Sequence, residues 1–322
     1  MSVPLIETKG LKKYFKTPKG ELHAVDDVNL KIEKGNTLGV VGESGCGKST
    51  LGRAILRLVE PTGGEVLYNG QNIINYNSKQ MMEIRKDLQI IFQDPYASLN
   101  PRMTISEIIA EPMIVCKTVR NRKDMNDKVY KLMETVGLAE RLINTYPHEL
   151  DGGRRQRIGI ARALALDPEF IVCDEPVSAL DVSIQAQILN LLMDLQDERG
   201  LTYMFITHDL SVVKHISKDI AVMYLGQCVE RTSSTDLFRN PMHPYTQALI
   251  KAIPAPHLRS KTQEDEIIKG EITSPINPKP GCRFAARCPK AGKACSETNV
   301  ELREIESGHF VACTLYCEPG IR

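Results

Sequence analysis

The glycine-rich stretch Gly42-Glu43-Ser44-Gly45-Cys46-Gly47-Lys48-Ser49-Thr50 carries residue types that bind phosphate. It has the spacing G-x-x-x-x-G-K-[ST], in which backbone N–H groups converge on phosphate oxygens and a following helix adds positive potential. In this pattern Lys48 reaches the terminal phosphates and Ser49 is a ligand of Mg²⁺. The stretch therefore predicts a nucleoside triphosphate site made by Gly42, Ser44, Gly45, Cys46, Gly47, Lys48, Ser49 and Thr50.

A second candidate for chemistry is Phe170-Ile171-Val172-Cys173-Asp174-Glu175, four apolar residues followed by two carboxylates. A strand that ends here would present Asp174 to a metal ion and Glu175 to an attacking water molecule. Together with the phosphate loop, the pattern predicts Asp174 as a Mg²⁺ ligand and Glu175 as a general base or water-orienting group.

Five of the nine cysteines gather near the C-terminus: Cys282, Cys288, Cys295, Cys313 and Cys317. In a reducing compartment such a cluster is more typical of metal binding than of disulfides. Three isolated cysteines, Cys116, Cys173 and Cys228, are predicted to be small buried hydrophobes.

Apolar patterns predict the elements that would position these residues. Continuous runs at 38–41, 88–92, 170–173, 203–206 and 220–223 are typical of strands buried on both faces of a parallel sheet. Val28, Leu30 and Ile32 alternate with polar residues, as in a half-buried strand. A helical face runs from Ile184 to Leu195, with Asp181 as its N-cap and Gly200 as its stop. This alternation of strands and helices indicates an α/β fold.

The spacing of elements also suggests domains. Residues 104–166 lack a buried strand, which predicts a helical insert at about 100–160. From Ile253 onward, prolines punctuate a polar segment that leads into the cysteines. We expect one domain at 1–253 and a C-terminal extension at 254–322.

Composition narrows the function classes. The chain has 322 residues, with 41 Lys and Arg against 40 Asp and Glu, and this balance argues against nucleic acid as the main partner. No apolar run approaches the roughly 18 residues of a membrane-spanning helix. The N-terminus lacks a secretory signal, so we expect a cytoplasmic protein.

The order of motifs resembles the ATPase subunits of ABC transporters. Gln93 matches the Q-loop, Leu150–Arg157 sits where the signature motif belongs, Ser178–Asp181 matches the D-loop, and His208 matches the switch histidine. Three stretches, 175–187, 240–246 and 270–278, are similar to the F-type ATPase subunit of oligopeptide, dipeptide and nickel importers. The resemblance implies an α/β P-loop NTPase core of the RecA-like type, with an N-terminal antiparallel β subdomain, a helical insert and a Cys-rich extension.

The resemblance also implies roles and partners. Tyr14 would stack on adenine, Gln93 would join Ser49 and Asp174 at Mg²⁺, and Glu175, His208 and Gln93 would act in catalysis. The partners would be a second, homologous ATPase subunit, two transmembrane permease subunits and an extracytoplasmic binding protein, with this chain peripheral on the cytoplasmic face of the membrane. The cargo would be a peptide, or alternatively nickel or a metal–chelate complex. A soluble ABC ATPase of repair or translation is a distant alternative, because the chain has neither a second cassette nor a long coiled coil.

Two parts of the resemblance leave alternatives open. The family's cluster motif implies a [4Fe–4S] cluster on Cys282, Cys288, Cys295 and Cys313; zinc, free thiols, and Cys317 in place of Cys313 are the alternatives. The signature residues Asp151, Gly152 and Gly153 would face ATP on the opposite subunit, but Asp151 replaces the usual Ser and Arg154 the usual Gln. Either the carboxylate weakens that second ATP site and makes the two sites unequal, or Asp151 turns away as a tolerated helix cap.

Overall fold

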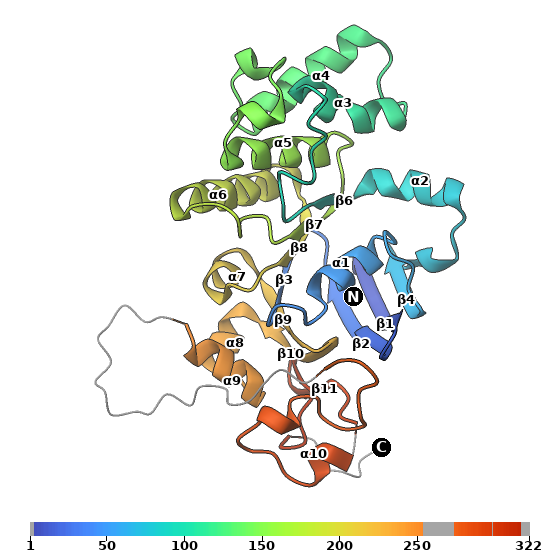
Figure 1. The fold of residues 1–322 in the computed structure, drawn as a ribbon, viewed down its shortest axis with the longest axis vertical. Helices are drawn as coiled ribbons and strands as arrows, with labels where there is room; N and C mark the ends of the chain where they lie inside the picture. Colours follow the sequence, from blue (N-terminus) through green and yellow to red (C-terminus); the bar gives the residue numbers. More distant parts are fainter. Residues whose placement is uncertain (1–2, 254–273, 298, 317–322) are drawn as a thin grey trace. The chain divides into compact units, whose positions relative to one another are not determined.

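Three parallel strands organise the first of two units in the computed structural model, which describes residues 3–253, 274–297 and 299–316 (Figure 1). This unit contains Ile32–Thr37 and Asn75–Ile206. Its strands lie in the order β6–β7–β8. The bounds of its elements are α2 (Ser78–Asp87), β6 (Leu88–Ile91), α3 (Ile105–Val115), α4 (Arg122–Thr135), α5 (Gly152–Leu164), β7 (Phe170–Asp174), α6 (Val182–Arg199) and β8 (Thr202–Ile206).

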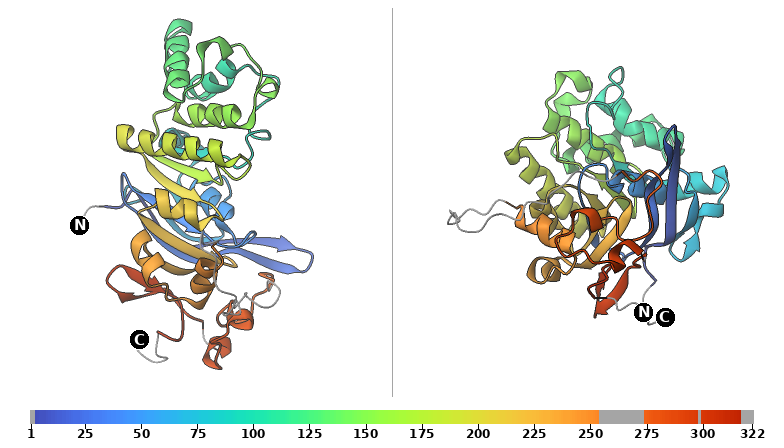
Figure 2. Two further views of the ribbon diagram at one scale, coloured as in Figure 1. Left: turned by 90° about the vertical axis from the view of Figure 1, so that its left-hand side faces the viewer. Right: turned by 60° about the horizontal axis from the view of Figure 1, so that its bottom comes forward.

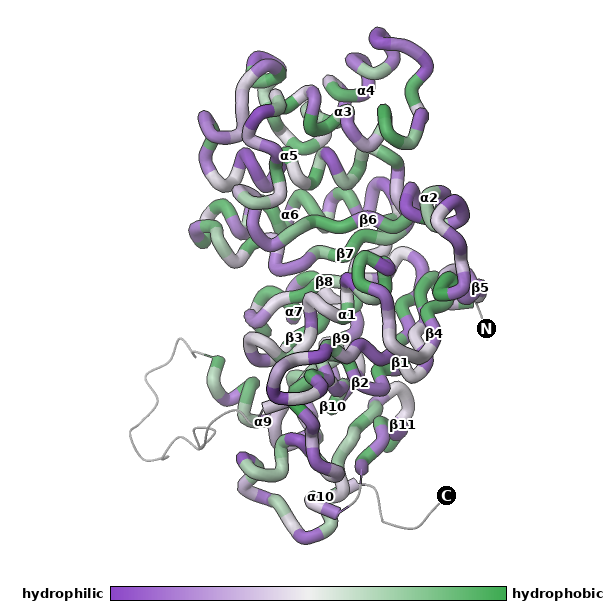
Figure 3. Tube along the Cα trace, turned by 45° about the vertical axis from the view of Figure 1, so that its right-hand side comes forward, coloured by the Kyte–Doolittle hydropathy of each residue, from purple (hydrophilic) through white to green (hydrophobic). Residues whose placement is uncertain are grey.

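The apolar runs predicted as doubly buried strands are confirmed for β7 and β8, in which every residue is buried. The hydropathy tube shows β7 as a mostly apolar segment (Figure 3). The expectation is wrong for β6, where Gln89 and Ile90 are only half-buried. The physical reason is its place in the sheet, because β6 is an edge strand with a single neighbour, β7.

Helical capping residues account for the ends of α6. The Asp181 carboxylate accepts a hydrogen bond from the backbone N–H of Ile184 at 3.0 Å, and Gly200 ends the helix in the left-handed conformation with φ 65°. Both predicted ends are confirmed. The stretch predicted as mostly helical holds α3, α4 and α5 (green in Figure 1) with two 3₁₀ turns, η2 (Glu140–Leu142) and η3 (Pro147–Glu149).

The second unit contains Val3–Lys31, Leu38–Ile74 and the described residues from Thr207 onward. Its strands and helices are β1 (Ile6–Thr17), β2 (Gly20–Ile32), β3 (Thr37–Val41), α1 (Lys48–Ile55), β4 (Gly63–Tyr68), β5 (Gln71–Asn72), α7 (Leu210–Ile216), β9 (Asp219–Tyr224), β10 (Gln227–Ser233), α8 (Ser234–Arg239), α9 (Pro244–Lys251), α10 (Ala294–Glu297), β11 (Arg303–Glu306) and β12 (His309–Val311). The short 3₁₀ turns are η1 (Ile73–Asn75) and η4 (Ala285–Arg287).

Two sheets run through this unit. The long hairpin of β1 and β2, blue in Figure 2, belongs to an antiparallel sheet of order β2–β1–β4–β5. In β2 the residues from Val28 to Ile32 alternate between buried and exposed, as predicted. The other strands lie in the order β11–β12–β10–β9–β3, in which β3 and β9 are parallel and the remaining pairs antiparallel. The C-terminal strands β11 and β12 therefore belong to the same strand order as β3, the strand that precedes the glycine-rich loop.

Candidate functional site

In the first unit, the structure brings together the predicted catalytic residues Gln93 and Glu175. The Gln93 side-chain amide donates to a Glu175 carboxylate oxygen at 2.9 Å. Asp174, the last residue of β7, is buried, whereas Glu175 follows it outside the strand. An amide that donates to a carboxylate orients that carboxylate, so the pair can hold a water molecule in one place.

The backbone at Glu175 is in an unusual conformation. Its φ is 46°, in the left-handed region that residues with a Cβ rarely adopt. The turn is held from both sides, because the Glu175 N–H donates to the carbonyl of Ile206 at 2.9 Å and the Ser178 hydroxyl donates to the carbonyl of Glu175 at 3.1 Å. Local strain that the surroundings maintain is typical of functional positions.

Asp151 is the N-cap of α5. Its carboxylate accepts from the backbone N–H of Arg154 at 2.8 Å and lies 3.4 Å from the Arg154 guanidinium. Gly152 and Gly153 form the first turn of the helix. The side chain that replaces the usual serine is therefore engaged with its own helix, which favours the expectation of a tolerated cap over that of a repelling charge.

In the second unit, the phosphate loop joins β3 to α1. The Lys48 ammonium donates to the carbonyls of Gly42 at 2.9 Å and Glu43 at 3.1 Å. The lysine side chain therefore folds back and hydrogen-bonds to the start of its own loop. Cys46 is buried beside it, and burial raises the pKa of the Cys46 thiol above its usual range. A neutral, buried thiol needs no redox role, as its variable position in the motif suggests.

Gly47 shows why the loop needs glycine at this position. Its φ is 104°, and a Cβ there would lie 2.0 Å from the carbonyl oxygen of Ala24. No side chain fits such an approach, so the strand residue Ala24 and the loop pack backbone to backbone. Ser49 and Thr50 follow in the first turn of α1, where the helix N-terminus favours an anion.

Tyr14 lies in β1 with its ring stacked on that of His23, at a centroid distance of 3.8 Å and an angle of 17°. Its hydroxyl donates to Asp26. Burial and this hydrogen bond raise the pKa of Tyr14, so the phenol stays neutral. His23 thus covers one face of the Tyr14 ring.

His208 is exposed on the turn that leads into α7. The turn is fixed by its neighbours, because the hydroxyl of Thr207 accepts from the N–H of Asp209 at 3.1 Å and Asp209 caps α7. These two hydrogen bonds fix the backbone turn that carries His208.

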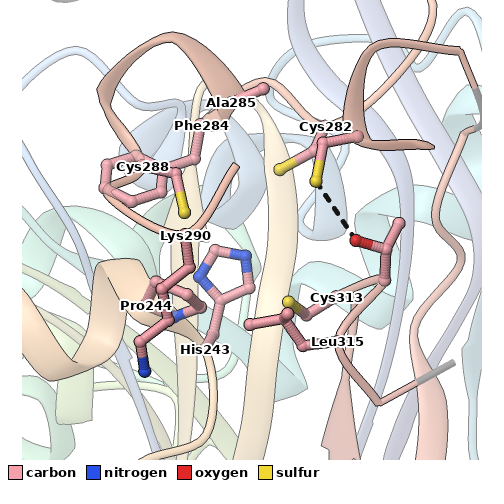
Figure 4. A pocket seen from close by; sticks show the side chains of 11 residues that line it. His243, Pro244, Cys282, Phe284, Ala285, Cys288, Lys290, Cys313 and Leu315 are labelled. Atoms are coloured by element: carbon pink, nitrogen blue, oxygen red, sulfur yellow. Dashed lines mark hydrogen bonds between the residues drawn. The ribbon is translucent and has the colours of Figure 1, made fainter. Parts of the chain in front are cut away.

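The four described C-terminal cysteines, Cys282, Cys288, Cys295 and Cys313, line one small pocket together with His243 (Figure 4). Burial raises the pKa of the Cys313 thiol to about 11 and lowers that of His243 to about 4. Within the residues that the structure describes, no three His, Cys, Asp or Glu side chains are placed so that they could hold a metal ion. Cys317 lies outside the described residues.

The three isolated cysteines differ in how far they are buried. Cys173 and Cys228 are buried, as predicted, and burial raises the pKa of both thiols. Cys116 is only half-buried, which contradicts the prediction. The reason is its position as the C-cap of α3, past the last residue that the helix packs into the core.

Sequence reasoning missed three buried side chains that make long-range contacts in the second unit. Arg287 binds Glu43 of the phosphate loop, Arg283 binds Asp26, and Glu230 is fully buried beside His309. The two partners of each pair are far apart in the sequence, separated by between 79 and 257 positions. No local spacing signals such contacts, although two arginines between Cys282 and Cys288 mark the segment as unusual.

Family models match two parts of the chain. The model "ABC transporter" matches residues 25–178, and the model "Oligopeptide/dipeptide transporter, C-terminal region" matches residues 229–295. Among solved structures, the bacterial ABC transporter cassette MJ0796 aligns with a TM-score of 0.65 at 31% identity, covering 71% of this chain and 98% of that chain. The cbiO1 subunit from Clostridium perfringens aligns with a TM-score of 0.66 at 25% identity, covering 74% and 92%. The fold and site thus define an ABC ATPase, with the predicted P-loop core and antiparallel β subdomain.

Curated relatives show which kind of ABC ATPase this chain is. The oligopeptide transport ATP-binding proteins OppF and AppF of Bacillus subtilis are 51% and 50% identical, with 98% and 97% of this chain and 97% of each relative covered. The dipeptide transport ATP-binding protein DppF of Haemophilus influenzae is 50% identical over 97% of both chains. The chain belongs to the ATP-binding subunits of oligopeptide and dipeptide ABC transporters. In the described part of the chain, no helix has the length and apolar character needed to cross a membrane.

Proposed function

We propose that this protein hydrolyses ATP to power the import of oligopeptides or dipeptides through a heteromeric ABC transporter. The observation that carries the proposal is a complete phosphate loop with Lys48 at its centre, in a chain about half identical to OppF and DppF along its whole length. The names of these relatives favour peptide over nickel or a metal–chelate complex as cargo. The two family matches favour a transporter subunit over a soluble ABC ATPase of repair or translation.

The residues divide the chemistry among them. Residues 42–50 would bind the phosphates, and Tyr14, whose ring is held in place by stacking on His23, would support the adenine. The hydroxyl of Ser49, the carboxylate of Asp174 and the amide of Gln93 are oxygen donors of the kind Mg²⁺ prefers. When bound, Mg²⁺ would neutralise charge on the β- and γ-phosphates.

Glu175 would then accept a proton from the attacking water, while Gln93 holds its carboxylate through their 2.9 Å hydrogen bond. His208 would contact the γ-phosphate side of the site from its fixed turn.

The partners in this proposal follow from the family. A second, homologous ATPase subunit would complete each ATP site, two transmembrane permease subunits would carry the peptide, and an extracytoplasmic binding protein would deliver it. This chain would be peripheral, on the cytoplasmic face of the membrane. We also retain the proposed division into an ATPase domain at 1–253, with its helical part at about 100–160, and a C-terminal extension at 254–322.

The four cysteines are proposed to bind a [4Fe–4S] cluster, with zinc as the second candidate. Four thiols that line one pocket are a donor set suited to either, and because no three of the described side chains stand in ligating positions, binding would have to draw the thiols together. When bound, the group would organise the fold of the extension; Cys282, Cys288, Cys295 and Cys313 would hold it. Protein purified without oxygen should be coloured and contain about four iron atoms per chain, and Cys288→Ser should lose both. Colourless protein with one zinc, or with no metal, would contradict the cluster.

The unusual signature residues Asp151 and Arg154 raise the question of whether the two ATP sites of the complex are equally competent. The cap made by Asp151 and its ion pair with Arg154 support two ATP sites of similar competence. In the assembled complex, Glu175→Gln and the matching substitution in the partner subunit should then reduce transport equally. A large loss from Glu175→Gln with little loss from the partner's substitution would instead establish unequal sites.

The test of the main proposal is ATP hydrolysis by the complex reconstituted in liposomes with loaded binding protein. Lys48→Ala should abolish ATP binding, whereas Glu175→Gln should keep binding and lose turnover by at least about 100-fold. The exposed residues Lys79 and Glu198 provide matched controls, Lys79→Ala and Glu198→Gln, which should behave as the unaltered protein. Turnover at the normal rate by Glu175→Gln would refute the assignment of the base.

A further inference from the structure

The C-terminal extension sends an arginine directly to the phosphate loop. Both terminal nitrogens of Arg287 reach the two carboxylate oxygens of Glu43, one atom donating at 2.8 Å and the other at 3.0 Å. The Arg287 side chain is only 7% exposed and that of Glu43 22%. The hydrogen bond to Glu43 raises the pKa of Arg287, so the guanidinium is always charged. A two-bond, largely buried pair of this kind fixes direction as well as distance.

Glu43 is a point of the phosphate loop where several hydrogen bonds meet. Its backbone N–H donates to the hydroxyl of Tyr245 at 2.9 Å, and its carbonyl accepts from the Lys48 ammonium at 3.1 Å and from the N–H of Cys46 at 3.2 Å. A side chain that fixes Glu43 therefore fixes the first turn of the loop and the resting place of its lysine. Arg287 acts on the phosphate-binding atoms through one intermediate residue.

A second arginine of the same segment reaches the adenine side. Arg283 donates to Asp26 and is also only 7% exposed. Asp26 accepts in turn from the Tyr14 hydroxyl. Burial by itself would raise the pKa of Asp26, but the hydrogen bonds from Tyr14 and His23 and the charge of Arg283 lower it. The carboxylate is therefore a stable bridge between Arg283 and the tyrosine.

The segment that carries both arginines is firmly anchored. Phe284, between them, is 1% exposed and packs against Tyr224 and Tyr245, each at a centroid distance of 5.3 Å. The turn is closed by hydrogen bonds from the N–H of Ala285 to Cys282 and from that of Arg287 to Phe284. Because the anchor is rigid, the two arginines keep a fixed separation.

We propose that residues 282–288 are an integral part of the ATP site, in which Arg287 positions the phosphate loop through Glu43 and Arg283 positions Tyr14 through Asp26. This inference rests on the proposed function, in which that loop and Tyr14 bind ATP. The extension then helps to position the nucleotide site. Its location near the end of the sequence gives no sign of this role. The two arms make separate predictions, since one serves the phosphates and the other the base.

The experiment measures dissociation constants of the full-length chain by calorimetry, for Mg–ATP and for Mg–tripolyphosphate, which has phosphates but no base. Arg287→Ala should weaken both ligands about tenfold, and Arg287→Lys should recover part of the loss. Arg283→Gln should weaken ATP by about fivefold and leave tripolyphosphate unchanged. Arg303→Ala, an exposed arginine of the same extension, is the control and should change neither.

A double-variant cycle shows whether Arg287 acts through Glu43. Arg287→Ala should have no further effect once Glu43→Ala is present. Glu43→Gln gives the same information if Arg287→Ala does not fold, because it removes only the charge on the loop side. Dissociation constants within twofold of the unaltered protein, fully additive effects, or equal weakening of both ligands by both arginine variants would overturn the inference. Unchanged ATP binding by Lys48→Ala would instead refute the proposed ATP site.

Discussion

Glu230 is a buried carboxylate whose replacement by glutamine should destabilise the second unit. It is 0% exposed and lies in β10. One of its oxygens accepts from the N–H of Met242 at 2.8 Å and lies 2.8 Å from the His309 Nε2 atom, and the other accepts from the N–H of His243 at 2.9 Å. The carboxylate thus joins β10, β12 and the start of α9.

The cost of Glu230→Gln follows from this arrangement. An amide offers one oxygen, so at least one backbone N–H now faces an NH₂ group and loses its acceptor. An unsatisfied buried donor costs about 1–3 kcal/mol. We expect a loss of about 3 kcal/mol in the free energy of unfolding, which corresponds to a fall in Tm of about 6–12 °C.

Differential scanning calorimetry of the full chain measures this loss. Glu297→Gln is the matched control, because Glu297 is an exposed glutamate of the same extension. Its Tm should stay within about 1 °C of the unaltered protein. A fall of less than about 2 °C for Glu230→Gln would show that the carboxylate does not hold these elements together.

Substitutions at three further positions test the packing and helix capping around the site. Gly47→Ala should weaken Mg–ATP binding more than tenfold in calorimetry, because its Cβ would lie 2.0 Å from the carbonyl oxygen of Ala24; retained affinity would contradict the close approach. Phe284→Ala should lower the unfolding free energy by about 3–5 kcal/mol in a thermal melt, since the ring is 1% exposed, whereas a loss under about 1 kcal/mol would mean that the extension packs loosely. Asp151→Ala should cost about 1 kcal/mol and Asp151→Ser almost nothing, because serine also caps a helix; equal losses in the two melts would argue against the cap.

Local patterns predicted most of the fold. The run at Phe170 and the caps Asp181 and Gly200 specify β7 and α6, because strand burial and helix ends depend on neighbouring residues. The phosphate loop is equally local. The sheet order is not, and so the sequence could not show that β6 is an edge strand with half-buried residues.

The site was predictable only where its residues belong to one motif. Gln93 and Glu175 were each identified, but the hydrogen bond between them spans 82 positions. Arg287 lies 244 positions from Glu43, and an arginine in a polar segment has no periodicity that distinguishes it from a surface residue. Long-range ion pairs are set by topology, which single-sequence patterns do not contain.

The spacing between Cys282 and Cys288 has a consequence for how this segment can change by insertion or deletion. The five intervening residues include one ring for the core and two arginines that must reach Asp26 and Glu43. A one-residue deletion there would misdirect Arg287 even if both thiols still met in the pocket. A variant chain could therefore lose its cysteines and still keep the length of this segment. The number of residues between positions 282 and 288 sets where Arg283 and Arg287 reach, and this requirement does not depend on any bound metal.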